Sequence, residues 1–120
     1  MSEFKVVALL KAKDGMSKEA LIEHYENIHA PLIRSQFPSI TAYRRNYCDF
    51  ADAYVYPDAA PFDFDMVTEI WFADEEGYRD MQRRYENPEV LAKIKEDESK
   101  FLDSGKTRMF VVDERVSVFD

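Results

Sequence analysis

The sequence is poor in the residues on which disulfide, zinc and phosphate-loop sites depend. Its single cysteine, Cys48, cannot form an internal disulfide and is expected to be a buried, unreactive thiol. Two histidines and one cysteine lack the spacing of zinc ligands, so no metal site is predicted. With only three glycines the chain has no glycine-rich phosphate loop, and no nucleotide cofactor is expected.

An excess of basic residues and a long hydrophobic run are also missing. The 24 acidic and 16 basic residues give a net charge of −8, whereas nucleic-acid and anionic-membrane surfaces attract basic proteins. The apolar run near the N-terminus is too short to span a bilayer, and no basic region or cleavage site of a signal peptide flanks it. We therefore expect a soluble cytoplasmic protein with no nucleic-acid or membrane partner.

The residues that are abundant predict a compact α+β domain. Hydrophobic residues make up 46% of the 120 positions, enough for one domain, 1–120, with a substantial core. Alternating or continuous apolar runs predict strands, and apolar residues at helical spacing predict helices. The order is strand 4–13, helix 17–29, strand 40–48, strand 65–73, helices 75–86 and 89–103, and strand 107–119. This βαββαβ order is typical of the ferredoxin-like fold, a four-stranded antiparallel sheet with helices on one face.

The first helix places several apolar residues and one histidine on the same side. Ser17 is a suitable N-cap. The inward stripe consists of Leu21, Ile22, Tyr25, Ile28, His29 and Leu32. Because Pro31 disfavours helical geometry at the preceding residue, the regular helix is expected to end near His29.

The strands carry apolar residues on both sides, although helices cover only one face of the predicted sheet. A bare apolar face marks an interface, and burial against a second copy of the chain is the simplest arrangement. We therefore expect a homodimer. The segment 49–64 is long for a hairpin connection, and its aromatic residues are expected to touch the partner or the mouth of a pocket.

The stretch "FKVVALLKAKDGMSKEALIEHYENIHAPLI" resembles the opening of EthD-domain proteins, in which a strand precedes a helix ending in His-Ala-Pro. The resemblance continues at "DMVTEIWF" and "EDESKFLD" and covers nearly the whole chain in order. It implies the dimeric α+β barrel superfamily, whose members are small homodimers, mostly without metal or organic cofactor. Some are lactone isomerases, polyketide cyclases or dehydratases, or cofactor-free monooxygenases. The fold transfers from such a resemblance, whereas the reaction does not.

His29 is the principal candidate for a catalytic residue. It belongs to the His-Ala-Pro motif, and Tyr25 lies one turn earlier on the same face. An imidazole can shuttle protons near neutral pH, although a core histidine satisfied by one carbonyl group is the alternative. We expect His29 to face a cavity, with a nearby carboxylate and the helix C-terminus outweighing burial and keeping the ring charged. His24 is expected on the solvent margin, without a role.

The other candidates lie on the last helix and on two strands. Asp97 would orient the imidazole of His29; the alternatives are a place at the margin of the inward face without a role, or a structural ion pair. Glu98 falls near the centre of that face and requires a partner, such as Arg44, Arg45 or the histidine. The candidates for binding the substrate are Tyr43, Tyr47, Glu69, Trp71 and Glu98, although an aromatic strand face more often forms a core or a dimer interface.

The leading hypothesis is a cofactor-independent enzyme that acts on a small lactone, aromatic or polyketide-like molecule. His29 would transfer a proton, and Tyr25 or Tyr43 would donate a hydrogen bond to an enolate oxygen, giving isomerisation, dehydration or cyclisation. A cofactor-free oxygenase belongs to the same set. The rival hypothesis is a non-catalytic dimer that binds a small molecule or assists another enzyme. A third interpretation has the cavity filled by aromatic side chains.

Overall fold

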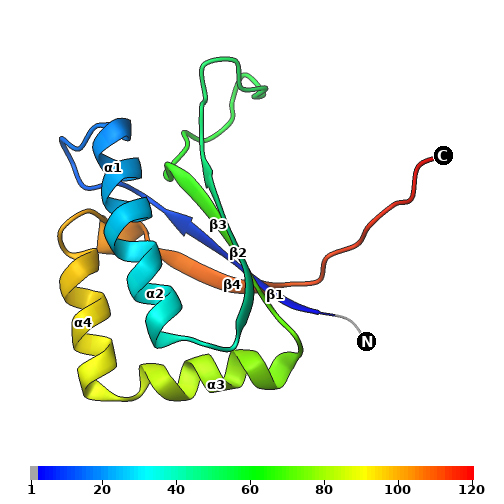
Figure 1. Ribbon diagram of the computed structural model, residues 1–120. Helices are drawn as coiled ribbons and strands as arrows, with labels where there is room; N and C mark the ends of the chain where they lie inside the picture. The colour runs from blue at the N-terminus through cyan, green and yellow to red at the C-terminus, as the bar shows by residue number, and fades with distance from the viewer. Residues whose placement is uncertain (1–2) are drawn as a thin grey trace.

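The computed structural model describes residues 3–120 and confirms the predicted α+β, ferredoxin-like architecture (Figure 1). The strands are β1 (Phe4–Leu10), β2 (Ile40–Tyr47), β3 (Met66–Phe72) and β4 (Arg108–Val112). The helices are α1 (Lys18–His24), the π-helical turn η1 (Tyr25–His29), α2 (Ala30–Gln36), α3 (Glu75–Tyr85), α4 (Pro88–Glu98) and the 3-10 turn η2 (Ser104–Lys106). Among the described residues no helix is long and apolar enough to cross a membrane.

The four strands form one antiparallel sheet in the order β2-β3-β1-β4. All the helices lie on one face of this sheet (Figure 1). Successive side chains of a strand point to opposite faces, so every second residue faces the helices. On β3 the helix-facing residues are Met66, Thr68, Ile70 and Phe72, and each of them is buried. The core therefore lies between this face and the helices.

The first helical segment does not end near His29, contrary to the expectation from Pro31. It continues to Gln36 because η1 inserts one extra residue, and the backbone N–H of Ala30 donates to the carbonyl of Tyr25, five residues earlier. This wide turn places Pro31 in the first turn of α2, where the missing proline N–H breaks no helical hydrogen bond. The helix therefore passes through the proline without stopping.

The π-helical turn also decides which side chains face the core. Tyr25 and His29 are both buried, with exposed fractions of 2% and 3%. Ile28, which a regular helix would have directed inward, is 52% exposed. The expected place of Ile28 on the apolar stripe is therefore wrong, because the extra residue rotates it toward solvent.

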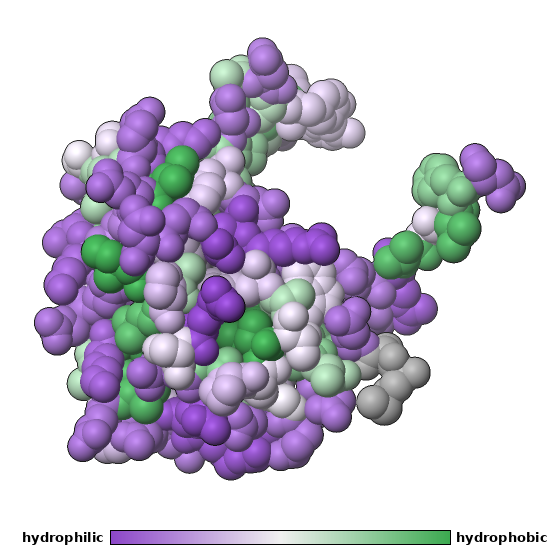
Figure 2. Space-filling view, in the orientation of Figure 1, coloured by the Kyte–Doolittle hydropathy of each residue, from purple (hydrophilic) through white to green (hydrophobic). Residues whose placement is uncertain are grey.

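The last strand is shorter than predicted. It stops at Val112, which pairs with Lys5, and β1 offers only one further residue before its own start. Without a neighbour to pair with, residues 113–120 leave the sheet as an extended tail (Figure 1). Figure 2 shows apolar residues on this tail, away from the body of the molecule. The three exposed apolar side chains of the tail are Val116, Val118 and Phe119.

Replacing two helical isoleucines by alanine is expected to change the free energy of unfolding by very different amounts. Ile94 is fully buried, so Ile94→Ala is expected to lower the free energy of unfolding by about 2–5 kcal/mol through lost burial and a residual cavity. Ile28→Ala removes the same atoms from an exposed position and should change the free energy of unfolding by less than about 1 kcal/mol. Urea unfolding of both variants measures the difference. Equal losses would contradict this placement of the core.

Candidate functional site

A cavity of about 270 Å³ lies between the helices and the sheet. Its walls are mainly apolar, with side chains such as Leu10, Ile33 and Met81. Seven polar residues also line it: Tyr25, His29, Tyr43, Thr68, Tyr85, Glu98 and Thr107. The space between the layers is therefore not filled by aromatic side chains, contrary to the third interpretation. An apolar cavity with a few converging polar groups is the usual form of a small-molecule site.

His29 faces this cavity and is held from behind by Asp97. Its Nδ1 lies 2.8 Å from Oδ2 of Asp97. Because an ionised carboxylate can only accept, the Nδ1–H donates this bond and leaves Nε2 as the nitrogen with a lone pair. Within residues 3–120, Nε2 has no hydrogen-bond partner. The geometry thus presents an oriented imidazole whose basic nitrogen is free for a ligand.

The same carboxylate binds the second histidine. His24 Nε2 lies 2.8 Å from Oδ1 of Asp97, and the ring of Phe101 packs against both imidazoles. Asp97 is 5% exposed and contacts His29, so the alternative that places it at the margin without a contact is wrong. The expectation for His24 is also corrected, because it is directed toward α4 rather than solvent. The cause is the close approach of the end of α4 to the first helical segment. A helical wheel shows the faces of one helix and cannot predict a contact between two helices.

Burial decides the charge of His29. It lowers the pKa of the imidazole below its ordinary value of 6.5, although the hydrogen bond and the charge of Asp97 act in the opposite direction. The expectation of a charged ring is therefore wrong. The helix C-terminus contributes nothing at this position, because the helix continues through α2. At neutral pH His29 is a neutral base.

Two tyrosines meet beside the histidine. The hydroxyls of Tyr25 and Tyr43 lie 2.5 Å apart, and the rings of Tyr25 and His29 are in contact, with centroids separated by 4.8 Å. Burial raises the pKa of both phenols, so both stay protonated at neutral pH. The pair can therefore donate a hydrogen bond to an oxygen atom in the cavity.

Glu98 lines the cavity without the ionic partner that was expected for it. Within residues 3–120 it forms no salt bridge, because Arg45 binds Glu26 and Arg44 lies over the ring of Trp71. Burial, followed by the nearby charge of Asp97, raises the pKa of Glu98. Its carboxyl group is therefore a proton carrier of higher basicity than an exposed glutamate.

The structure does not bring the remaining predicted residues into the cavity. Glu69 and Trp71 lie on the helix-free face of the sheet, where Lys5 binds the carboxylate of Glu69 at 2.9 Å and lies over the indole of Trp71. Their interpretation as pocket residues is corrected, since they alternate with the inward residues of β3. Tyr47 faces the helices, but its hydroxyl donates to Glu26 at 2.6 Å instead of lining the cavity.

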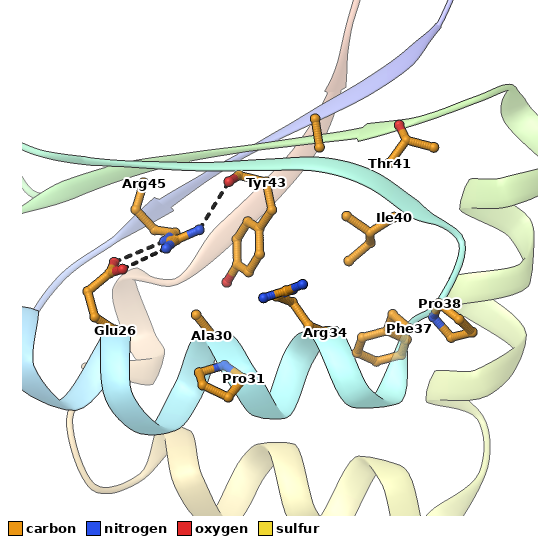
Figure 3. Close-up of a pocket in the computed structure, with 11 residues that line it drawn as sticks. Glu26, Ala30, Pro31, Arg34, Phe37, Pro38, Ile40, Thr41, Tyr43 and Arg45 are labelled. Carbon is orange, nitrogen blue, oxygen red and sulfur yellow. Dashed lines mark hydrogen bonds and ion pairs between the residues drawn. The ribbon is translucent and has the colours of Figure 1, made fainter.

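A second hollow adjoins the first and was missed from the sequence. It has a volume of about 480 Å³ and lies between β2 and the helical segment η1–α2 (Figure 3). Arg45 donates two hydrogen bonds to Glu26, at 2.6 and 2.9 Å, and Arg34 also points into this hollow (Figure 3). Tyr43 lines both hollows and so forms part of the wall between them. The sequence offered no signal for this pairing, because the partners lie on different elements.

Thr68 was also missed, although the sequence carried a signal for it. It is the one polar residue on the inward face of a strand whose other inward residues are Met66, Ile70 and Phe72.

Residues 3–120 contain no group of three or more His, Cys, Asp or Glu side chains placed to hold a metal ion.

Comparison with known proteins gives one family and several similar folds. Residues 13–105 match the EthD domain. An EthD family protein from Bacillus halodurans is 24% identical, with a TM-score of 0.61, over 95% of this chain and 100% of that one. A DABB family protein with a ferredoxin-like fold from Mesorhizobium loti is 15% identical, with a TM-score of 0.59, over 97% and 100% of the two chains.

A more distant structure is also similar. SnoaB, a cofactor-independent oxygenase from Streptomyces nogalater, is 12% identical, with a TM-score of 0.58, over 100% of both chains. At these identities the similar structures show a shared fold. No curated protein matches the chain.

The lowered pKa of His29 predicts a pH dependence of stability. The unfolded chain takes up a proton near the ordinary pKa of 6.5, whereas the folded protein resists protonation, so stability falls as the pH drops below about 6.5. Urea unfolding between about pH 8 and pH 5 should show this loss, and His29→Gln should lack that component while His24 remains in both proteins. An identical pH dependence in parent and variant would contradict the neutral, buried state of His29.

Proposed function

The chain belongs to the EthD domain family, and we propose that it is a cofactor-independent enzyme that moves a proton on a small, largely apolar molecule. One observation carries this proposal: His29 is a neutral base, its Nδ1 fixed by Asp97 and its Nε2 free toward an apolar cavity. A base of lowered pKa that is oriented by a carboxylate is suited to proton transfer near neutral pH.

In the proposed reaction, Nε2 of His29 takes a proton from a carbon atom next to a carbonyl group. The imidazolium that forms is stabilised by Asp97, which already accepts from Nδ1 at 2.8 Å. Removal of the proton places negative charge on the carbonyl oxygen. The protonated Tyr25–Tyr43 pair would donate a hydrogen bond to that oxygen as the charge develops.

Return of the proton to a different atom completes an isomerisation, a dehydration or a ring closure. His29 can deliver it, and Glu98 is a second carrier, because its raised pKa lets it hold a proton in the same cavity. The walls are mainly apolar, and among residues 3–120 no Lys or Arg side chain lines them, which favours lactone, aromatic or polyketide-like compounds over strongly charged ones. The chemistry of SnoaB, described as an oxygenase that needs no cofactor, is compatible with such a cavity.

The test begins with the molecule that copurifies with the protein, identified by native mass spectrometry and then offered as substrate. His29→Gln should retain the fold, since glutamine keeps a polar group of similar size, but lose turnover by roughly 100-fold or more. Glu23→Gln, an exposed change on α1, is the matched control. His24→Gln is unsuitable as a control because His24 binds Asp97. Unchanged turnover in His29→Gln would support a non-catalytic binding protein instead.

We also propose that the protein is a homodimer. The helix-free face of the sheet presents Val7, Leu9, Val67 and Phe110, and Phe110 is 44% exposed. The tail 113–120 and the connection between β2 and β3 extend from the body of the molecule with exposed apolar and aromatic side chains (Figure 1). Apolar surface of this kind supports an interface with a second copy.

Light scattering is expected to give a mass of about 28 kDa at micromolar concentration, twice the 14.1 kDa of one chain. Phe110→Glu should shift the mass toward one chain, because a carboxylate cannot be buried unpaired in an apolar interface. An exposed change far from this face, Glu23→Gln, should leave the dimer intact. A stable 14.1 kDa species for the parent protein would refute the proposal.

A further inference from the structure

Thr68 is a buried polar group that the proposed reaction does not use. It lies on β3, faces the helices and is 1% exposed. Its Oγ1 is buried and has no hydrogen-bond partner among residues 3–120. A buried hydroxyl without a partner is destabilising, and native proteins rarely keep one. Valine has almost the same shape, so packing alone does not explain a threonine at this position.

The surroundings of Thr68 leave room for a ligand. The residue directly opposite on β1 is Ala8, whose side chain is small, and both residues line the cavity of about 270 Å³. This volume is just below the range of about 300–1,000 Å³ that is usual for sites of drug-sized ligands. Thr68 thus lies in the wall of an open space instead of inside packed core, although its Oγ1 atom is itself buried.

Thr68 adds a third hydroxyl to those of Tyr25 and Tyr43. All three residues line the same cavity. The Thr68 hydroxyl exerts a hydrogen-bonding effect that lowers the pKa of Tyr25, against the burial that raises it, although the two groups do not meet the geometry of a full hydrogen bond. Three hydroxyl groups carry three protons, and the bond between Tyr25 and Tyr43 uses one of them. Two protons are left to donate, and an oxygen atom of a ligand between the sheet and η1 could accept both.

We propose that Thr68 and the Tyr25–Tyr43 pair form a binding site for a neutral carbonyl or phenolic oxygen on an aromatic ligand. The inference deepens the proposed function and rests on it for the identity of the cavity. A carboxylate-bearing ligand fits less well, because Glu98 lines the cavity and, in the described part of the chain, no Lys or Arg side chain does. The apolar walls bind the rings, and the hydroxyl groups select the oxygen.

A matched pair of probes, 2-naphthol and naphthalene, tests this site by calorimetric titration of the full-length protein. The parent protein is expected to prefer 2-naphthol. Thr68→Val should lower the affinity for 2-naphthol about five- to tenfold through the lost hydrogen bond and leave the affinity for naphthalene unchanged. The same change should raise the thermal midpoint of the ligand-free protein, because an unpaired buried hydroxyl is removed. Thr68→Ser keeps the hydroxyl group and should keep the preference for 2-naphthol over naphthalene.

Three results would overturn the proposal: unchanged 2-naphthol affinity in Thr68→Val, equal weakening of both probes, or no binding of 2-naphthol by the parent protein. The test is separate from that of the proposed reaction. Binding of 2-naphthol and naphthalene is measured without turnover, and Glu23→Gln, an exposed change on α1, should bind both probes as the parent does. A failure of proton transfer and a failure of oxygen recognition are therefore distinguishable.

Discussion

The carboxylate of Asp97, buried between two imidazoles, is the interaction on which the rest of the site depends. Each of its oxygens accepts one hydrogen bond of 2.8 Å, from His24 and from His29, so a single side chain joins the end of α4 to the first helical segment. Loss of one partner from a buried ionic group is costly, because the remaining charge has no water around it. The packing of α4 against the first helical segment and the direction of His29 are thus fixed by the same contact.

The elements could be predicted from the sequence because each depends on local patterns. Alternation in 65–73 and helical spacing in 75–86 gave the strands and helices, and their order gave the fold. Tyr25 and His29 were placed correctly on an inward face for the same reason. The sequence suggested the contact between Asp97 and His29. The contact of Asp97 with His24 could not be predicted, because it joins two helices that are distant in sequence. Glu69 and Trp71 were placed on the wrong face of the sheet, although strand alternation itself separates them from the inward residues.

Burial controls the protonation of the site more than any single neighbour does. It lowers the pKa of His29 and raises those of Glu98 and the two tyrosines, so every group shifts toward its neutral form. Such a cavity penalises charged ligands and favours neutral ones. The chain carries a net charge of −8, yet His29, Tyr25 and Tyr43 present uncharged donors and acceptors to the cavity.

The π-helical turn at Tyr25–His29 makes the length of the chain between Ser17 and Pro31 a constraint. Each helical residue advances the chain by about 100°, so deleting one residue from the turn would restore a regular helix and rotate one half of it against the other. Either the imidazole or the apolar side chains of α2 would then leave the core. The connection between β2 and β3 has no such restriction. Insertions and deletions can therefore be accommodated at that connection, whereas the number of residues in the first helical segment must stay fixed for the site to keep its geometry.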